Sequence, residues 1–294
     1  MLPGILLIIL AHDAIAPIIS YGQSGDAVST FKTVYSDRLD ARGILSVAPN
    51  LKGPMEDASA SEIARLVTVR ILTQNGSGSG AIVARRGPTY TVLTNNHVVI
   101  DTPENGYRLI TADGEYHAAW WMPLPQFGNL DLALVQFTSS NSYRVAEIAD
   151  SNALSVGDPV YAAGFPAWHF NQEGDRLVSI EDTRDWGVSA FRVTLGQVQM
   201  RSPRSLQGGY QIGYTNDVLL GMSGGPVVDR NGALIGINGK LKYPFQGINA
   251  FIFADGSVPS PQLFEQMEAL SWAIPIAQFQ QNTIPLNEES QGGL

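Results

Sequence analysis

The chain has 294 residues, of which 44% are hydrophobic and 15% are charged, so it can form a sizeable core. Its net charge of −9 argues against a nucleic-acid partner, since binding to phosphates needs clustered Lys and Arg. The chain contains no cysteine, which excludes disulfides, thiolate nucleophiles and cysteine-based zinc sites.

The N-terminal region starts with an apolar stretch, residues 2–11, that is too short to cross a bilayer, which takes roughly 20 residues. This length fits the apolar core of a signal peptide, although no Lys or Arg precedes it. Gly22 and Ser24 offer small residues for cleavage. We therefore expect residues 1–24 to be a signal peptide and the protein to be periplasmic or extracellular, without a membrane span in its mature form. An uncleaved apolar arm is the alternative.

Residues 25–60 show weak periodicity and are expected to form an N-terminal extension. Residues 57–65 are predicted to form a helical turn with Ser61 as its N-cap. Residues 138–152 are polar and are expected to link two subdomains, and residues 166–174 are expected to form a loop.

Short alternating or β-branched runs recur along the chain and are separated by glycine-rich and proline-rich turns. They predict strands at residues 66–73, 81–85, 90–93, 107–111, 115–121, 130–137, 159–163, 191–198, 209–214, 225–228, 233–238 and 271–276. Asp113-Gly114 and Asn231-Gly232 are predicted hairpin turns. Further helices are predicted for residues 261–270 and 277–281 near the end, before a polar tail at residues 284–294. The pattern is typical of an all-β sandwich or barrel rather than βαβ winding.

The run from Gly221 to Pro226, with the sequence Gly-Met-Ser-Gly-Gly-Pro, surrounds one serine with glycines. Such a run can form a tight turn that presents the Ser223 hydroxyl together with the backbone N–H groups of Gly221 and Ser223. Two converging N–H groups are suited to stabilise an oxyanion. A serine hydroxyl is a weak nucleophile at neutral pH and needs a nearby base.

Only four histidines could supply that base. His12 lies in the expected signal peptide, His117 lies within a strand-like run beside aromatic residues, and His169 lies in the expected loop. His97 follows a polar Thr-Asn-Asn sequence at the end of a predicted strand, where a side chain can project into a cleft. His97 is therefore the favoured base.

A base of this kind is usually oriented by a buried carboxylate. Asp131 is the acid embedded in an apolar predicted strand, where an unpaired charge would be costly. The alternative is that it caps a turn after Gly128-Asn129. Asp101 and Asp113 lie in turn-like contexts and are weaker candidates.

Four runs in this order resemble those of the chymotrypsin-fold serine proteases, and more closely the bacterial trypsin-like peptidases of the HtrA/Deg type. They are Gly78-Ser79-Gly80, Thr94-Asn95-Asn96-His97-Val98-Val99, Asp131-Leu132-Ala133-Leu134 and Gly221-Met222-Ser223-Gly224-Gly225-Pro226. The run from Gly209 to Asn216 is similar to that of cyanobacterial trypsin-like peptidases. The resemblance covers about residues 61–281.

The resemblance implies an all-β fold of two six-stranded antiparallel β-barrels with a short C-terminal helix, in a protease domain at residues 61–283. Barrel one would span about residues 61–140 and barrel two about residues 153–283. The implied activity is hydrolysis of protein or peptide substrates through an acyl-enzyme, without a metal or other cofactor. His97, Asp131 and Ser223 would form the triad, and the N–H groups of Gly221 and Ser223 the oxyanion hole. The oligomeric state is left open.

The chain also departs from its relatives. Digestive trypsin-like enzymes have an aspartate where Met222 stands, so we expect no activation by pairing with a freed N-terminus. HtrA-type proteins usually carry a PDZ module after the protease, and none is expected here. Asp217 lies six positions before Ser223, where trypsin has its specificity aspartate, which would favour Lys or Arg in the substrate. Gly239, Lys240 and Leu241 would also line the substrate pocket; a solvated turn is the alternative for Asp217.

The run Gly221 to Gly225 also fits the G-x-S-x-G elbow of α/β-hydrolases. That fold needs its acid and then its histidine after the serine, and the last histidine, His169, comes before Ser223. The elbow is therefore excluded. Two rival hypotheses on the chymotrypsin fold stay open, namely a catalytically silent binding module and an esterase with the same triad.

Overall fold

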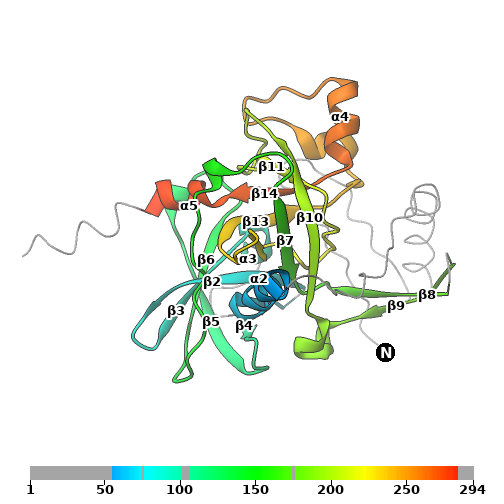
Figure 1. The fold of residues 1–294 in the computed structure, drawn as a ribbon. Helices are drawn as coiled ribbons and strands as arrows, with labels where there is room; N and C mark the ends of the chain where they lie inside the picture. Colours follow the sequence, from blue (N-terminus) through cyan, green and yellow to red (C-terminus); the bar gives the residue numbers. More distant parts are fainter. Residues whose placement is uncertain (1–54, 75, 101–105, 174–175, 284–294) are drawn as a thin grey trace, which may run out of the picture. The chain divides into compact units, whose positions relative to one another are not determined.

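The computed structural model describes residues 55–74, 76–100, 106–173 and 176–283. The expected signal peptide, most of the expected extension and the polar tail lie outside these residues. Two closed antiparallel barrels of six strands each dominate the described chain (Figure 1), which confirms the predicted architecture.

Barrel one has the strand order β1-β2-β3-β6-β5-β4. Its strands are β1 (Thr68–Leu72), β2 (Ser77–Arg86), β3 (Thr89–Thr94), β4 (Tyr107–Ile110), β5 (Tyr116–Met122) and β6 (Ala133–Thr138). Strand β3 pairs with β6 along its whole length, from Thr89 opposite Thr138 to Thr94 opposite Ala133. This pairing brings the end of β3 and the start of β6, where the expected base and acid lie, to one edge of the barrel.

Barrel two has the order β10-β11-β14-β13-β12-β7. Its strands are β7 (Pro159–Gly164), β10 (Arg192–Arg201), β11 (Ile212–Tyr214), β12 (Pro226–Val228), β13 (Leu234–Lys240) and β14 (Ser271–Pro275). The short strand β12 pairs with both β13 and β7. The expected nucleophile turn ends where β12 begins, so it is attached to a strand that is paired on both sides.

Helices and short 3-10 turns complete the chain. They are α2 (Met55–Val67), α3 (Asn96–Val99), η1 (Pro125–Phe127), η2 (Ser151–Ala153), η3 (Arg184–Ala190), η4 (Gly247–Phe251), α4 (Pro261–Glu268) and α5 (Ile276–Thr283). The side chains of Ala60 and Ala64 on α2 are buried against Tyr161, Ala163 and Val228 of barrel two.

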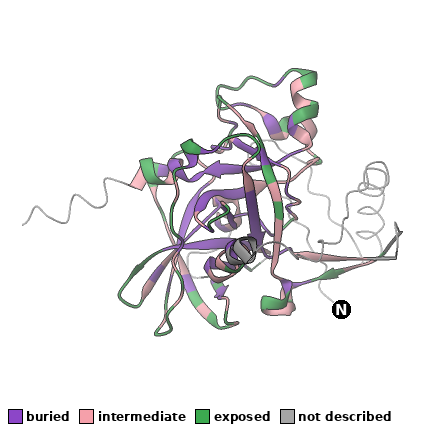
Figure 2. Cartoon of the chain, in the orientation of Figure 1, coloured by how far each residue is buried: buried purple, intermediate pink, exposed green. Residues whose placement is uncertain are grey.

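The core includes a cluster that both barrels share. It contains Leu93, Leu132 and Leu134 from barrel one together with Ile237, Trp272 and Ile274 from barrel two. Each Å² of apolar surface that is buried stabilises the fold by roughly 25 cal/mol. Figure 2 shows buried residues in both barrels. The two barrels therefore hold each other in a fixed arrangement, and with them the residues at their junction.

Three details of the predicted elements are wrong. Ser61 lies inside α2 rather than at its N-cap, because the helix starts at Met55. Asp131 does not lie within a strand, because β6 starts only at Ala133. The expected loop at residues 166–174 contains β8 (Trp168–Glu173), which pairs with β9 (Arg176–Asp182) in a two-stranded antiparallel sheet. This hairpin belongs to a different compact unit from the barrels.

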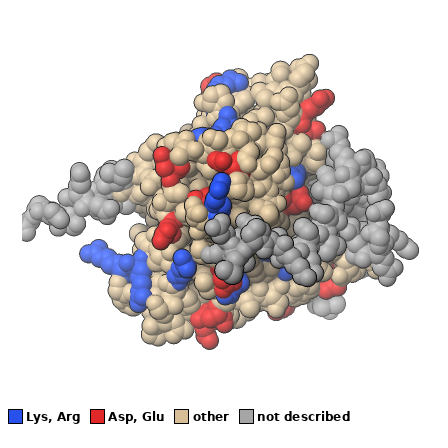
Figure 3. Space-filling view, in the orientation of Figure 1, with Lys and Arg blue, Asp and Glu red and all other residues tan. Residues whose placement is uncertain are grey.

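Charged side chains of both signs are interspersed on the face of the molecule in Figure 3, with no basic stripe on that face. Among the described residues, every helix is too short or too polar to cross a membrane.

Candidate active site

His97 lies on the single helical turn α3, which follows directly after β3. The buried residue Asn95 precedes the turn, and its Nδ2 donates to the backbone carbonyl of Asp131 at 2.8 Å. The next residue of the turn is Val98, whose side chain packs against Gly78. A Cβ at Gly78 would lie 2.5 Å from the Val98 side chain. These contacts fix the turn, so the His97 side chain has a defined position.

Asp131 receives two hydrogen bonds from His97. The His97 backbone N–H donates to Oδ1 at 2.9 Å, and the ring Nδ1 lies 2.6 Å from Oδ2. Because Nδ1 carries the proton toward the carboxylate, Nε2 is left as the acceptor nitrogen of the neutral ring. The structure therefore brings together the expected base and the expected acid.

The charge of Asp131 is stabilised by these partners. Burial alone would raise the pKa of the carboxyl, but the attraction and hydrogen bonds of His97, with a hydrogen bond from the Tyr210 hydroxyl, hold the pKa below its ordinary value. The backbone of Asp131 is fixed as well, since its N–H donates to the Gly208 carbonyl at 2.9 Å. Asp131 is thus an ionised group held from both barrels.

Ser223 is buried, with 8% of its surface exposed, in the turn that precedes β12. The turn rests on barrel one, because the Ser79 N–H donates to the Ser223 carbonyl at 2.8 Å. Gly224 lies directly against Thr94 and Asn95, which precede His97, so that a Cβ at Gly224 would be 2.1 Å from Thr94 Oγ1. Among the described residues, no hydrogen bond joins Ser223 Oγ to His97.

Position 221 has to be a glycine. Its φ is +95°, and a Cβ would lie 2.4 Å from the backbone nitrogen of Ala167. Its carbonyl accepts a hydrogen bond from Ser79 Oγ at 2.9 Å, so it points into the protein. Within the described part of the chain, the N–H groups of Gly221 and Ser223 donate to no protein acceptor, which leaves both donors available.

Met222 is fully buried in the apolar cluster of barrel two. Its backbone N–H donates to the Leu219 carbonyl at 2.9 Å, and its sulfur accepts from the Leu219 N–H at 3.4 Å. The side chain therefore stabilises the turn through packing rather than through an ion pair.

Asp217 forms an ion pair within the chain. Lys242 Nζ lies 2.6 Å from Asp217 Oδ1 and also donates to the Thr215 carbonyl at 2.6 Å. A cation of the protein thus occupies the carboxylate that is expected to bind a Lys or Arg of the substrate. A preference for basic substrates stays a prediction, and it requires this ion pair to open.

The remaining expected pocket residues, Gly239, Lys240 and Leu241, lie at and just after the end of β13. Gly239 and Lys240 contact Tyr210, since a Cβ at Gly239 would lie 2.0 Å from the Tyr210 hydroxyl and Lys240 Nζ is 4.6 Å from the centre of its ring. Leu241 packs at the edge of the apolar cluster of barrel two. Their role in substrate binding stays a prediction.

The remaining histidines that the structure describes lie elsewhere. His117 on β5 is half-buried, and its Nε2 shares hydrogen bonds with Tyr143 at 2.9 Å and Thr111 at 3.2 Å. Burial is the main reason that the pKa of His117 is lowered. His169 lies on β8 in the separate hairpin. His12 lies outside the described residues.

Sequence reasoning assigned no role to Tyr210 or to the side chain of Ser79. Ser79 Oγ donates to Gly221 and accepts from the Phe165 N–H at 2.8 Å, and Tyr210 donates to Asp131. The only signals in the sequence were glycines beside each residue, which mark close approach of the backbone.

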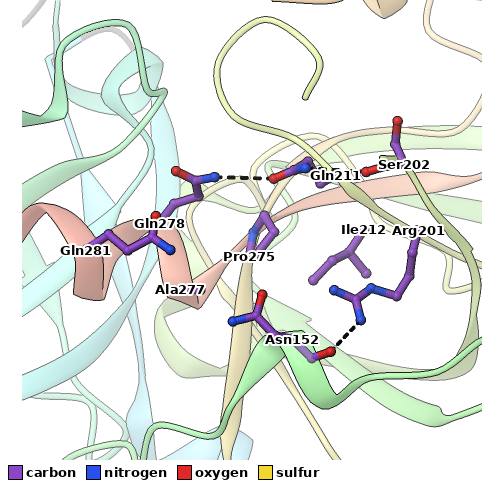
Figure 4. Close-up of a pocket in the computed structure, with 9 residues that line it drawn as sticks. All are labelled: Asn152, Arg201, Ser202, Gln211, Ile212, Pro275, Ala277, Gln278 and Gln281. Atoms are coloured by element: carbon purple, nitrogen blue, oxygen red, sulfur yellow. Dashed lines mark hydrogen bonds between the residues drawn. The ribbon is translucent and has the colours of Figure 1, made fainter. Parts of the chain in front are cut away.

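A separate cavity of about 90 Å³ lies between α5 and the β10–β11 region (Figure 4). Two of its polar side chains are hydrogen-bonded within the chain. Arg201 Nη1 donates to the Asn152 carbonyl at 2.8 Å, and Gln278 Nε2 donates to Gln211 Oε1 at 3.2 Å. It contains none of the expected catalytic residues.

Comparison with known proteins identifies relatives over a large part of the chain. Residues 78–237 match the family described as "Trypsin-like peptidase domain". "Serine protease Do-like HtrB" from Bacillus subtilis is 27% identical over 300 residues, covering 92% of this chain and 61% of the relative. "Probable periplasmic serine protease do/HhoA-like" from Haemophilus influenzae is 32% identical over 195 residues, covering 65% of this chain and 36% of the relative.

A solved structure, that of the serine endoprotease from Yersinia pestis, superposes with a TM-score of 0.52 at 22% identity, covering 78% of this chain and 66% of the other. This similarity supports the fold. The chain matches only about a third of the length of several of its curated relatives. Since the family match extends over more than half of the sequence, this chain belongs to the trypsin-like peptidase domain family.

Proposed function

We propose that the protein is a serine endopeptidase in which Ser223 is the nucleophile, His97 the general base and acid, and Asp131 the group that orients His97. The observation that carries the proposal is the double hydrogen bond of His97 to Asp131, beside a turn in which the N–H groups of Gly221 and Ser223 have no acceptor among the described residues. Family membership and relatives named as serine proteases support it.

The reaction uses the acceptor nitrogen that the Asp131 contact leaves free. Ser223 Oγ attacks the carbonyl carbon of a peptide bond while its proton passes to His97 Nε2. The oxyanion then lies between the N–H groups of Gly221 and Ser223. His97 returns the proton to the leaving amine, and a water molecule, deprotonated by His97, hydrolyses the acyl-enzyme. Contact between base and nucleophile often tightens only when substrate binds.

The substrate class is protein or peptide, and the site of action is the periplasm or the exterior of the cell. Relatives from Haemophilus influenzae and Bartonella henselae carry "periplasmic" in their names, which supports this location. The expected signal peptide at residues 1–24 would provide the route, and it lies outside the described residues.

A fluorophosphonate probe, which reacts covalently with activated serines, tests the proposal. We expect labelling of the wild-type protein, no labelling of Ser223→Ala, and loss of labelling by several orders of magnitude in His97→Ala. Ser142→Ala is the matched control, because Ser142 is exposed and lies on a loop that holds no expected catalytic residue. Absence of labelling in the folded wild type would indicate a silent binding module. Labelling together with hydrolysis of esters but not of an unfolded protein would indicate an esterase.

A further inference from the structure

Tyr210 occupies a position next to the expected triad that the proposed mechanism does not use. It lies two residues before β11 in barrel two and is 2% exposed. Its hydroxyl donates a hydrogen bond to Asp131 Oδ2, the same oxygen that faces His97 Nδ1. A residue of barrel two therefore contacts the acid of barrel one directly.

The surroundings of Tyr210 are built to admit its hydroxyl. Residue 239 is a glycine, and any side chain there would clash, because its Cβ would lie 2.0 Å from the Tyr210 oxygen. The Gly208 carbonyl accepts a hydrogen bond from the Asp131 N–H. This bond holds the segment before β11, which carries Tyr210, next to Asp131. Placement of the hydroxyl thus depends on Gly239 of β13 and on the segment before β11 that carries Tyr210 itself.

The hydroxyl acts as a donor throughout the working pH range. Burial and the nearby charge of Asp131 raise the pKa of Tyr210 well above its ordinary value, so the proton stays on oxygen. The charged and titratable groups that face this pair are His97, Lys240 and Tyr214. Burial lowers the pKa of Lys240, while the charge of Asp131 opposes that effect.

We propose that Tyr210 is a positioning residue that fixes the Asp131 carboxylate and draws negative charge from it, so that Asp131 holds His97 in its working orientation. The inference rests on the proposed function. With the hydroxyl present, Oδ1 is committed to the His97 backbone and Oδ2 is shared between the His97 ring and Tyr210. Without it, the carboxylate is held by His97 alone and its charge acts more strongly on the imidazole.

The test is the second-order rate constant for fluorophosphonate labelling, measured from roughly pH 5 to 9. Tyr210→Phe keeps the ring beneath Lys240 and removes only the donor. We expect the rate constant to fall roughly tenfold, as for a lost hydrogen bond to a charged group. We also expect the acid limb of the profile to move to higher pH, because the less neutralised carboxylate favours the protonated imidazole.

Tyr90→Phe is the matched control, since Tyr90 is a fully buried tyrosine whose hydroxyl donates to the Asn141 carbonyl at 2.9 Å in barrel one. It is expected to lose stability while keeping the wild-type pH profile. Gly239→Ala is an independent second variant that displaces the Tyr210 hydroxyl with the tyrosine retained, and it should shift the profile in the same direction. Near-ultraviolet circular dichroism reports which variants fold.

The outcomes are distinct. A wild type that is not labelled refutes the proposed function. The role of Tyr210 is refuted if the wild type is labelled and folded Tyr210→Phe or Gly239→Ala shows the wild-type rate constant and pH profile. This holds even if the melting temperature of the variant falls. The proposed function would then remain intact.

Discussion

Ser79→Ala should destabilise the protein more than its small change in volume suggests. Ser79 is fully buried on β2, and its hydroxyl links two segments of barrel two. It donates to the Gly221 carbonyl at 2.9 Å and accepts from the Phe165 N–H at 2.8 Å. Alanine keeps the backbone bond from residue 79 to the Ser223 carbonyl, so the substitution isolates the hydroxyl.

The magnitude follows from the two groups left without a partner. A buried backbone N–H or carbonyl that loses its hydrogen bond costs about 1–3 kcal/mol. Two such groups, at Phe165 and Gly221, give an expected loss of about 3 kcal/mol in the free energy of unfolding, with some relaxation included. Because Gly221 precedes the nucleophile turn, the same variant should also slow the labelling of Ser223.

Urea unfolding measures the loss. Both proteins would carry Ser223→Ala so that self-digestion does not distort the equilibrium. The unfolding midpoint should fall while the slope m stays constant, which marks a change in stability alone. Ser142→Ala, which removes an exposed hydroxyl that accepts from Arg85 at 3.1 Å, should change stability by less than about 0.5 kcal/mol. Equal midpoints for Ser79→Ala and Ser142→Ala would refute the reasoning.

Three further predictions concern single residues. Gly224→Ala should unfold the protein at a lower urea concentration than Gly256→Ala, because both glycines have φ +83° but only Gly224 is surrounded within 4 Å. Wild-type stability in urea should fall more steeply than that of Asp131→Asn from about pH 5 to 3, because the pKa of Asp131 is depressed and its contribution is lost as pH falls through that pKa. Lys242→Gln should raise the labelling preference for probes with a lysine-like over a leucine-like side chain, since it frees Asp217.

Each of these has a contrary result. Equal midpoints for the two glycine variants would show that the crowding at Gly224 costs nothing. Parallel pH slopes for wild type and Asp131→Asn would show that Asp131 gains no stabilisation from His97. An unchanged probe preference in Lys242→Gln, or one that survives when Asp217→Ser is added, would remove Asp217 from the substrate pocket.

The sequence predicted an all-β fold because short apolar and β-branched runs bounded by turn residues are local signals, and the two barrels followed only from the family resemblance. Strands β1, β11, β12 and β14 are buried on every residue, so alternation of buried and exposed residues was not the signal there. The turn at Asn231-Gly232 is one of these local signals, with Gly232 at φ +82°. The β8–β9 hairpin was missed, since polar residues between Pro166 and Gly174 masked the strand preference of Trp168 and Phe170.

Within the site, the local sequence indicated which residues had side chains suited to acyl-transfer chemistry. The contacts between these side chains depend on segments that are far apart in the sequence. Asp131 is expected in a strand and lies before one, yet it meets His97 because β3 pairs with β6. Tyr210 reaches Asp131 across a sequence separation of 79 residues, and Lys242 reaches Asp217 across 25. No local pattern along the chain encodes these contacts. The Tyr210–Asp131 contact depends on how the two barrels pack, and the Lys242–Asp217 contact depends on the fold of barrel two.

The nucleophile turn depends on the same packing. Its carbonyl at Gly221 is held by Ser79, its N–H at Gly224 donates to the Asn238 carbonyl at 2.9 Å, and Met222 fills the apolar cluster beneath it. All three contacts form between parts of the folded barrels, and none needs a charge at residue 222. We therefore expect the turn to reach its shape when the barrels fold, so that labelling of Ser223 should not depend on removal of residues 25–54.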